Sequence, residues 1–162
     1  MRRFTAFILT GLVVMAAGWA APVAPDVRDT QDNPVNQPGE MIRFDAVHVF
    51  VDSGTTPLAA YQLSLHATTG NVRIVGIEGS DHHAFANPPY YDPIAIQGDR
   101  VIIGAFSTAD VDSLPTGKTR IATIHVQITG GQAEYETELT VSAGVDGLAI
   151  PGRLTLVTES QQ

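Results

Sequence analysis

The feature that most restricts the fold is an alternation of apolar and polar residues with a period of two. It is clearest over residues 119–129 (TRIATIHVQIT), where four apolar residues share one face: Ala122, Ile124, Val126 and Ile128. Side chains alternate between the two faces of a β-strand, whereas one face of a helix recurs every 3.6 residues. The pattern therefore predicts a β-strand, and the chain shows no comparable stretch of helical period.

Six more stretches have the same character and are separated by turn residues. They cover residues 44–52, 58–66, 72–78, 100–106, 133–143 and 149–158. Gly-containing segments at residues 69–71 and 130–131 supply two of the expected turns. Seven or more short strands at roughly ten-residue spacing are typical of antiparallel sandwiches. We therefore expect an all-β fold, a two-layer antiparallel β-sandwich.

The N-terminus has the three parts of a secretory leader. Arg2 and Arg3 give a positive start, residues 4–17 are apolar, and residues 18–20 end in small side chains around Trp19. Residues 1–20 are predicted to be a cleaved signal peptide, so we expect a secreted or periplasmic protein. The alternative is a retained anchor, although the apolar run is shorter than the roughly 20 residues of a membrane span.

Composition divides the rest of the chain. Residues 21–40 are rich in Pro, Asp, Asn and Gln without either period, which predicts a disordered linker. The β-sandwich domain is expected over residues 41–158, and residues 159–162 are expected to form a flexible tail. At this size the chain suits one domain with one core.

Charge and cysteine content exclude several classes of function. Without Arg2 and Arg3 the exported chain has seven basic residues against seventeen acidic ones, a net charge of −10. Such a charge argues against nucleic acid or an anionic membrane surface as a partner. The absence of cysteine excludes disulfides, thiolate zinc sites and a thiol nucleophile.

The segment of residues 76–99 (GIEGSDHHAFANPPYYDPIAIQGD) is chemically unlike the rest of the chain. Its prolines stiffen the backbone around Tyr90 and Tyr91, because proline fixes φ and restricts the residue before it. Exposed aromatic rings can stack on sugars or anchor a protein partner. We expect Tyr90, Tyr91 and Phe85 to contact the ligand or partner. The alternative is that the tyrosines cap one end of the core.

The same segment holds candidate metal ligands. Asp81, His82, His83 and Asp92 combine imidazole and carboxylate groups, a workable set for zinc. The alternative is a solvated polar loop in which the histidines bind nothing. No cofactor is expected to be required, but calcium is a second possible ion because carboxylates gather in two long loops. Those residues are Asp81, Asp92, Asp99, Asp110 and Asp112.

Catalytic signatures are missing from the sequence. It contains no G-x-S-x-G, H-E-x-x-H, P-loop or dinucleotide-binding fingerprint. We therefore expect a protein that is not an enzyme.

Three segments together resemble the cohesin and carbohydrate-binding-module type of β-sandwich, a jelly-roll-like domain found in secreted bacterial proteins. They are LAAYQLSLHATTGNVRIVGIEG (residues 58–79), RVIIGAFSTAD (residues 100–110) and LPTGKTRIATIHVQITG (residues 114–130). The resemblance implies extracellular recognition, since cohesins bind dockerins through one sheet face and related modules bind polysaccharide. The loop that carries His82, His83, Tyr90 and Tyr91 has no counterpart in that pattern, so no binding residue is transferred.

These observations predict an exported, non-catalytic recognition or assembly module. Its partner would be a protein or a polysaccharide outside the cytoplasm. One alternative is a periplasmic metal-binding or small hydrolytic domain centred on residues 78–92. Another is a structural subunit of an envelope assembly.

Overall fold

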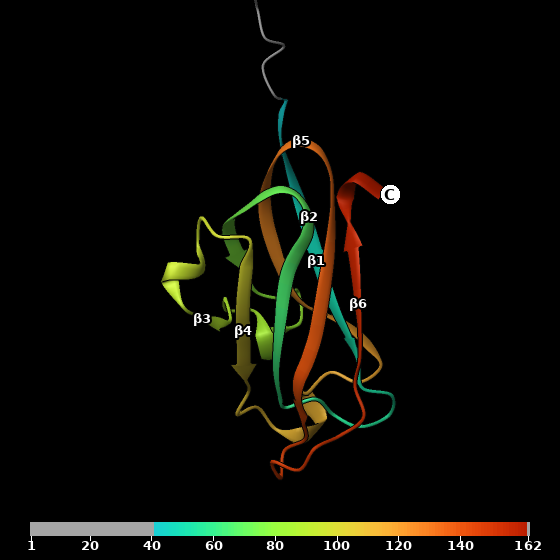
Figure 1. Ribbon diagram of the computed structural model, residues 1–162. Helices are drawn as coiled ribbons and strands as arrows, with labels where there is room; N and C mark the ends of the chain where they lie inside the picture. The colour runs from blue at the N-terminus through green and yellow to red at the C-terminus, as the bar shows by residue number, and fades with distance from the viewer. Residues whose placement is uncertain (1–40, 162) are drawn as a thin grey trace, which may run out of the picture. The chain divides into compact units, whose positions relative to one another are not determined.

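The computed structural model describes residues 41–161, which form one antiparallel β-sheet with four short 3-10 helices (Figure 1). The sheet has the strand order β3-β4-β2-β5-β1-β6. Its strands are β1 (Ile42–Asp52), β2 (Ala60–Glu78), β3 (Tyr90–Tyr91), β4 (Arg100–Phe106), β5 (Lys118–Ala143) and β6 (Arg153–Thr158). The 3-10 helices are η1 (His83–Phe85), η2 (Pro93–Ala95), η3 (Val111–Ser113) and η4 (Glu159–Gln161). The all-β, antiparallel character predicted from the alternation is confirmed.

Two long strands organise the sheet, and both bend at a glycine. β2 has 19 residues and β5 has 26, and they pair with each other along most of their length. Gly70 and Gly130 lie at the bends with φ angles of 82° and 83°, a region that L side chains rarely adopt. Figure 1 shows β5 turning back on itself at its label, with β2 bending beside it. The sheet therefore folds back over itself without a break in the strands.

The expected turns at residues 69–71 and 130–131 do not end strands. Pairing between β2 and β5 continues on both sides of the bend, from Ala67 opposite Tyr135 to Asn71 opposite Thr129. Register shifts at this point let the two strands curve together. Four predicted strands are therefore two bent ones.

The core lies between the halves of this bent sheet. The first half of β2 pairs with β4 and the second half of β5, whereas the first half of β5 pairs with β1. Side chains from both halves belong to one buried cluster, whose fully buried members include Val47, Val49, Leu63, Leu65, Ile74, Ile103, Ile124 and Val126. The alternating apolar residues thus supply a single core.

The end of the described chain is held against β1. The Asp45 carboxylate accepts hydrogen bonds from the Ser160 hydroxyl at 2.6 Å and the Ser160 backbone N–H at 3.3 Å. Of residues 159–162, which were predicted to be a flexible tail, Glu159–Gln161 form the 3-10 helix η4. Asp45 is buried, so this contact gives its carboxylate the partners that a buried charge requires.

The predicted signal peptide (residues 1–20) and linker (residues 21–40) lie outside the described residues. Over residues 41–161, the structure contains no helix with the length and apolarity of a membrane span.

Candidate functional site

The two tyrosines of the proline-rich segment lie at an edge of the sheet. Tyr90 and Tyr91 form β3 and pair with Gly104 and Ile103 of β4. Neighbouring residues of a strand point to opposite faces, so the two rings are separated. Tyr91 is half-buried and packs against the core, whereas Tyr90 is 73% exposed on the outer face. Tyr90 is therefore the member of the pair that is available to a ligand.

Tyr90 lies beside a second exposed aromatic ring. The ring centroids of Tyr90 and Phe106 are 6.2 Å apart and their planes differ by 10°. Phe106, at the end of β4, is 61% exposed. Because its period-two position places it on the same face as Gly104, both rings stand on the outer face of the sheet. Sequence reasoning identified Tyr90 but missed Phe106, whose exposure depends on where β4 ends.

These rings border a shallow hollow that we call the aromatic hollow. It has a volume of about 460 Å³ and is lined by Tyr90, Phe106, Gly104, Ile102, Gln62 and Val141, among others. Gly104 forms its floor, where a Cβ atom would lie 3.3 Å from the backbone oxygen of Tyr61. Ile102 and Val141 add exposed apolar surface around the floor. The hollow is therefore mostly apolar and open to solvent.

Phe85 does not lie at this surface. Its side chain is 3% exposed and its ring meets Tyr61 edge-on, with centroids 5.2 Å apart and planes at 73°. An edge-to-face contact of this kind stabilises a core. The structure therefore places Phe85 of η1 in the core and not at a ligand-binding surface.

Three of the four candidate metal ligands each contact a different partner. Asp81 forms an ion pair with Arg120, and an Asp92 carboxylate oxygen accepts the Ile94 backbone N–H at 3.0 Å. The Nδ1 atom of His82 accepts the Ala84 backbone N–H at 3.2 Å and so caps η1.

The two histidines are stacked, with ring centroids 4.6 Å apart and planes at 27°. Partial burial, together with the positive charge of His83, lowers the pKa of His82. Within residues 41–161 no three His, Asp or Glu side chains gather as a metal would require. Neither the four residues proposed for zinc nor the loop aspartates proposed for calcium form such a group in this range.

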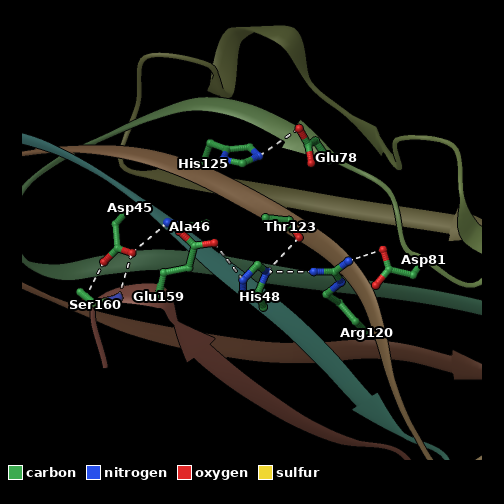
Figure 2. A network of polar contacts seen from close by, with 10 residues as sticks. All are labelled: Asp45, Ala46, His48, Glu78, Asp81, Arg120, Thr123, His125, Glu159 and Ser160. Carbon is green, nitrogen blue, oxygen red and sulfur yellow. Dashed lines mark hydrogen bonds and ion pairs between the residues drawn. The ribbon is translucent and has the colours of Figure 1, made fainter. Parts of the chain in front are cut away.

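Arg120 instead belongs to a polar network that joins the loop after β2 to β5, β1 and η4. Figure 2 shows its guanidinium between Asp81 and His48. His48 Nδ1 lies 3.4 Å from Arg120 and 3.1 Å from the Thr123 hydroxyl, and His48 Nε2 lies 3.6 Å from the Glu159 carboxylate. Because a guanidinium can only donate, His48 Nδ1 must be the acceptor and Nε2 carries the proton.

A second contact of this kind lies on the neighbouring strands. His125 of β5 lies 3.2 Å from the carboxylate of Glu78 at the end of β2 (Figure 2). His48 and His125 lie within the strands expected over residues 44–52 and 119–129, but their partners are distant in sequence, so the sequence alone does not pair them. Only the strand order brings Glu159 next to β1.

The network links β1 and β5 to the segments that follow β2 and β6. Its only hydroxyl beside an imidazole belongs to Thr123, which is 4% exposed and out of reach of a substrate. Its carboxylates are paired with Arg or His. We therefore take the exposed aromatic hollow, and not this network, as the candidate site.

Comparison with known proteins adds no family assignment. No protein-family model matches the sequence, and no curated protein or solved structure is significantly similar to the chain.

Proposed function

We propose that this chain is an exported, non-catalytic recognition or assembly module. It binds another envelope or extracellular protein, or a glycan, through the outer face of the sheet at the aromatic hollow. The observation that carries this proposal is the pair of parallel, exposed rings of Tyr90 and Phe106 beside Gly104.

The aromatic hollow exposes several large apolar side chains to solvent. Tyr90, Phe106, Ile102 and Val141 are each at least 40% exposed, and all four line one hollow. Large contiguous apolar patches on a folded surface mark sites that another molecule covers. Aromatic residues are also over-represented among the side chains that dominate binding energy. A partner that covered this hollow would remove both rings from water.

The proposal includes the type of fold, a cohesin-like β-sandwich. A cohesin-like β-sandwich is supported by the bends of β2 and β5 and by one buried core between the halves of the sheet. In such a fold one outer sheet face is free for recognition. The sequence resemblance to cohesins and carbohydrate-binding modules agrees with this use of the face.

Export is supported by the N-terminal sequence, with its basic start, apolar run and small residues before Ala21. A reporter enzyme that is active only outside the cytoplasm, fused after residue 40, provides the test. Activity that is lost on changing Arg2 and Arg3 to Glu would support export. An inactive wild-type fusion would contradict it.

The alternatives have less support. A metal-binding or hydrolytic domain needs convergent ligands, yet Asp81, His82 and Asp92 have separate partners. A purely structural subunit of an envelope assembly would not require an exposed aromatic pair beside a hollow.

Binding can be tested with the purified exported chain on a glycan array and in pull-downs from an envelope extract. The double variant Tyr90→Ala/Phe106→Ala should lose the captured partner. Phe44→Ala is a matched control, because Phe44 is 71% exposed but lies on β1. Equal recovery by wild type and the double variant would contradict the site.

A further inference from the structure

A second hollow lies on the same sheet face as the aromatic hollow, and we call it the acidic hollow. It has a volume of about 380 Å³ and is lined by Ser64, His66, Arg100, Glu136, Thr137 and Glu138. Its residues come from β4, β2 and the second half of β5, the strands that also form the aromatic hollow. The two hollows therefore belong to one continuous surface.

The strand register fixes how the hollows are arranged. Gln62 lies opposite Gly104 and Val141 in one row across the sheet, and His66 lies opposite Arg100 and Glu136 in another. Directly opposed residues share a face, as do residues two apart along a strand. The rows are four residues apart along β4, which is about 13 Å at about 3.3 Å per residue.

Charge distinguishes the second hollow from the first. Glu136 and Glu138 are exposed, and neither forms an ion pair with any residue in the described range. Arg100 is the only permanent positive charge that lines this hollow, so two carboxylates face one guanidinium. Unpaired carboxylates at the edge of a binding surface favour a cationic partner and disfavour an anionic one.

We propose that the partner is a polypeptide segment that combines an apolar side chain with a lysine or arginine. The apolar side chain fills the aromatic hollow, and the cation lies over Glu138 and Glu136, about 7 to 13 Å away, because Glu138 lies opposite Ser64 in the row between the other two. In an extended segment this distance corresponds to about two to four residues. The inference rests on the proposed function, since it names the partner class for the same face. An uncharged glycan would supply no cation for these carboxylates.

The test is a selection of random displayed dodecapeptides on the immobilised exported chain. We expect the selected peptides to share an aromatic or aliphatic residue with Lys or Arg about two to four positions away. The dissociation constant of a selected synthetic peptide should rise about two- to fivefold for each of Glu136→Gln and Glu138→Gln, and this effect should shrink at high salt. Glu134→Gln is the matched control, because Glu134 has the same chemistry on the same strand but does not line the hollow.

The following outcomes would overturn the inference, and each can be distinguished from the others. Selected peptides without a shared cation, or unchanged affinity in Glu136→Gln/Glu138→Gln, would exclude the cationic partner. Glycan binding that needs Tyr90 and Phe106 but tolerates both glutamine variants would leave the proposed function standing and overturn this inference. A wild-type dimer that Tyr90→Ala/Phe106→Ala dissociates would assign the face to a second copy. No binding that depends on the two rings would overturn both proposals. Thermal melting of every variant confirms that it is folded.

Discussion

The phenolic hydroxyl of Tyr61 donates a hydrogen bond to the backbone carbonyl oxygen of Ile121, with a distance of 3.1 Å between the two oxygens. Tyr61 lies in the first half of β2 and Ile121 in the first half of β5, segments that do not pair with each other. The bond is buried and passes through the core. It therefore ties together the two halves of the bent sheet at a point that no strand pairing reaches.

Replacing Tyr61 with phenylalanine should lower the free energy of unfolding by about 1–3 kcal/mol. The ring is kept, but the buried carbonyl of Ile121 loses its hydrogen-bond partner from the opposite half of the sheet. Urea unfolding at pH 7 measures the change. Tyr135→Phe is the matched control, because the Tyr135 hydroxyl is buried without a hydrogen-bond partner in residues 41–161. Removing that hydroxyl should leave stability unchanged or slightly raised. Equal losses in both variants would show that the Tyr61 bond contributes nothing of its own.

Tyrosine ionisation should destabilise the protein at high pH. Burial raises the pKa of Tyr61 well above its ordinary value, and burial together with the negative charge of Asp45 raises the pKa of Tyr135 to about 12. A tyrosine in the unfolded chain titrates near pH 10. The folded state therefore binds these protons more tightly, so their contribution is complete below about pH 10 and is lost as the pH rises through 12.

Tyr135→Phe should accordingly lose less stability than wild type between pH 9 and pH 11.5. The difference in stability between the variant and wild type is moderated because Tyr135 is only half-buried. Urea midpoints measured across this range, with absorbance at 295 nm to follow tyrosinate formation, test the expectation. Parallel pH curves for the two proteins would contradict it.

Most of the strands could be predicted from the sequence, because the alternation of apolar and polar residues shows directly which side chains face a core. The prediction for residues 100–106 coincides with β4, and the alternation over residues 119–129 lies within β5. It could not show that Gly70 and Gly130 are bends within strands, because a glycine with positive φ serves turns and bends equally well.

Only part of the candidate site could be predicted from the sequence, because its residues come from strands that are distant in sequence. Tyr90 could be chosen from its proline-rich surroundings, but Phe85 has the same local polarity and is buried. Phe106 and Glu138 become neighbours of one surface only through the order β4-β2-β5. Partners brought together by strand order leave no local pattern that a single sequence could reveal.

Substitution of the two bend glycines should have unequal costs. Gly70 and Gly130 have nearly the same positive φ, so alanine at either position pays a similar backbone strain of about 1–2 kcal/mol. A Cβ atom at Gly70 would also lie 2.8 Å from the backbone oxygen of Gln132, whereas one at Gly130 would meet nothing within 4 Å. Gly70→Ala should therefore be the more destabilising change in urea unfolding. Equal costs would mean that β5 relaxes away from β2 at the bend.

The cap at η1 should depend on pH. His82 Nδ1 accepts the Ala84 backbone N–H, which requires an unprotonated nitrogen, and partial burial with the charge of His83 lowers the pKa of His82. A lowered histidine pKa contributes stability that is present above the unfolded value near 6.5 and is lost as the pH falls through the folded value. His82→Ala should thus cost a few tenths of a kcal/mol at pH 7.5, typical of a weak exposed cap, and less at pH 5. His82→Asn should restore the loss at both pH values, because its side-chain oxygen accepts the same N–H without titrating. Thermal melts of wild type and the two variants at pH 7.5 and pH 5 test the cap. An Asn variant as unstable as the Ala variant would show that His82 stabilises this segment by packing against His83 and not by capping.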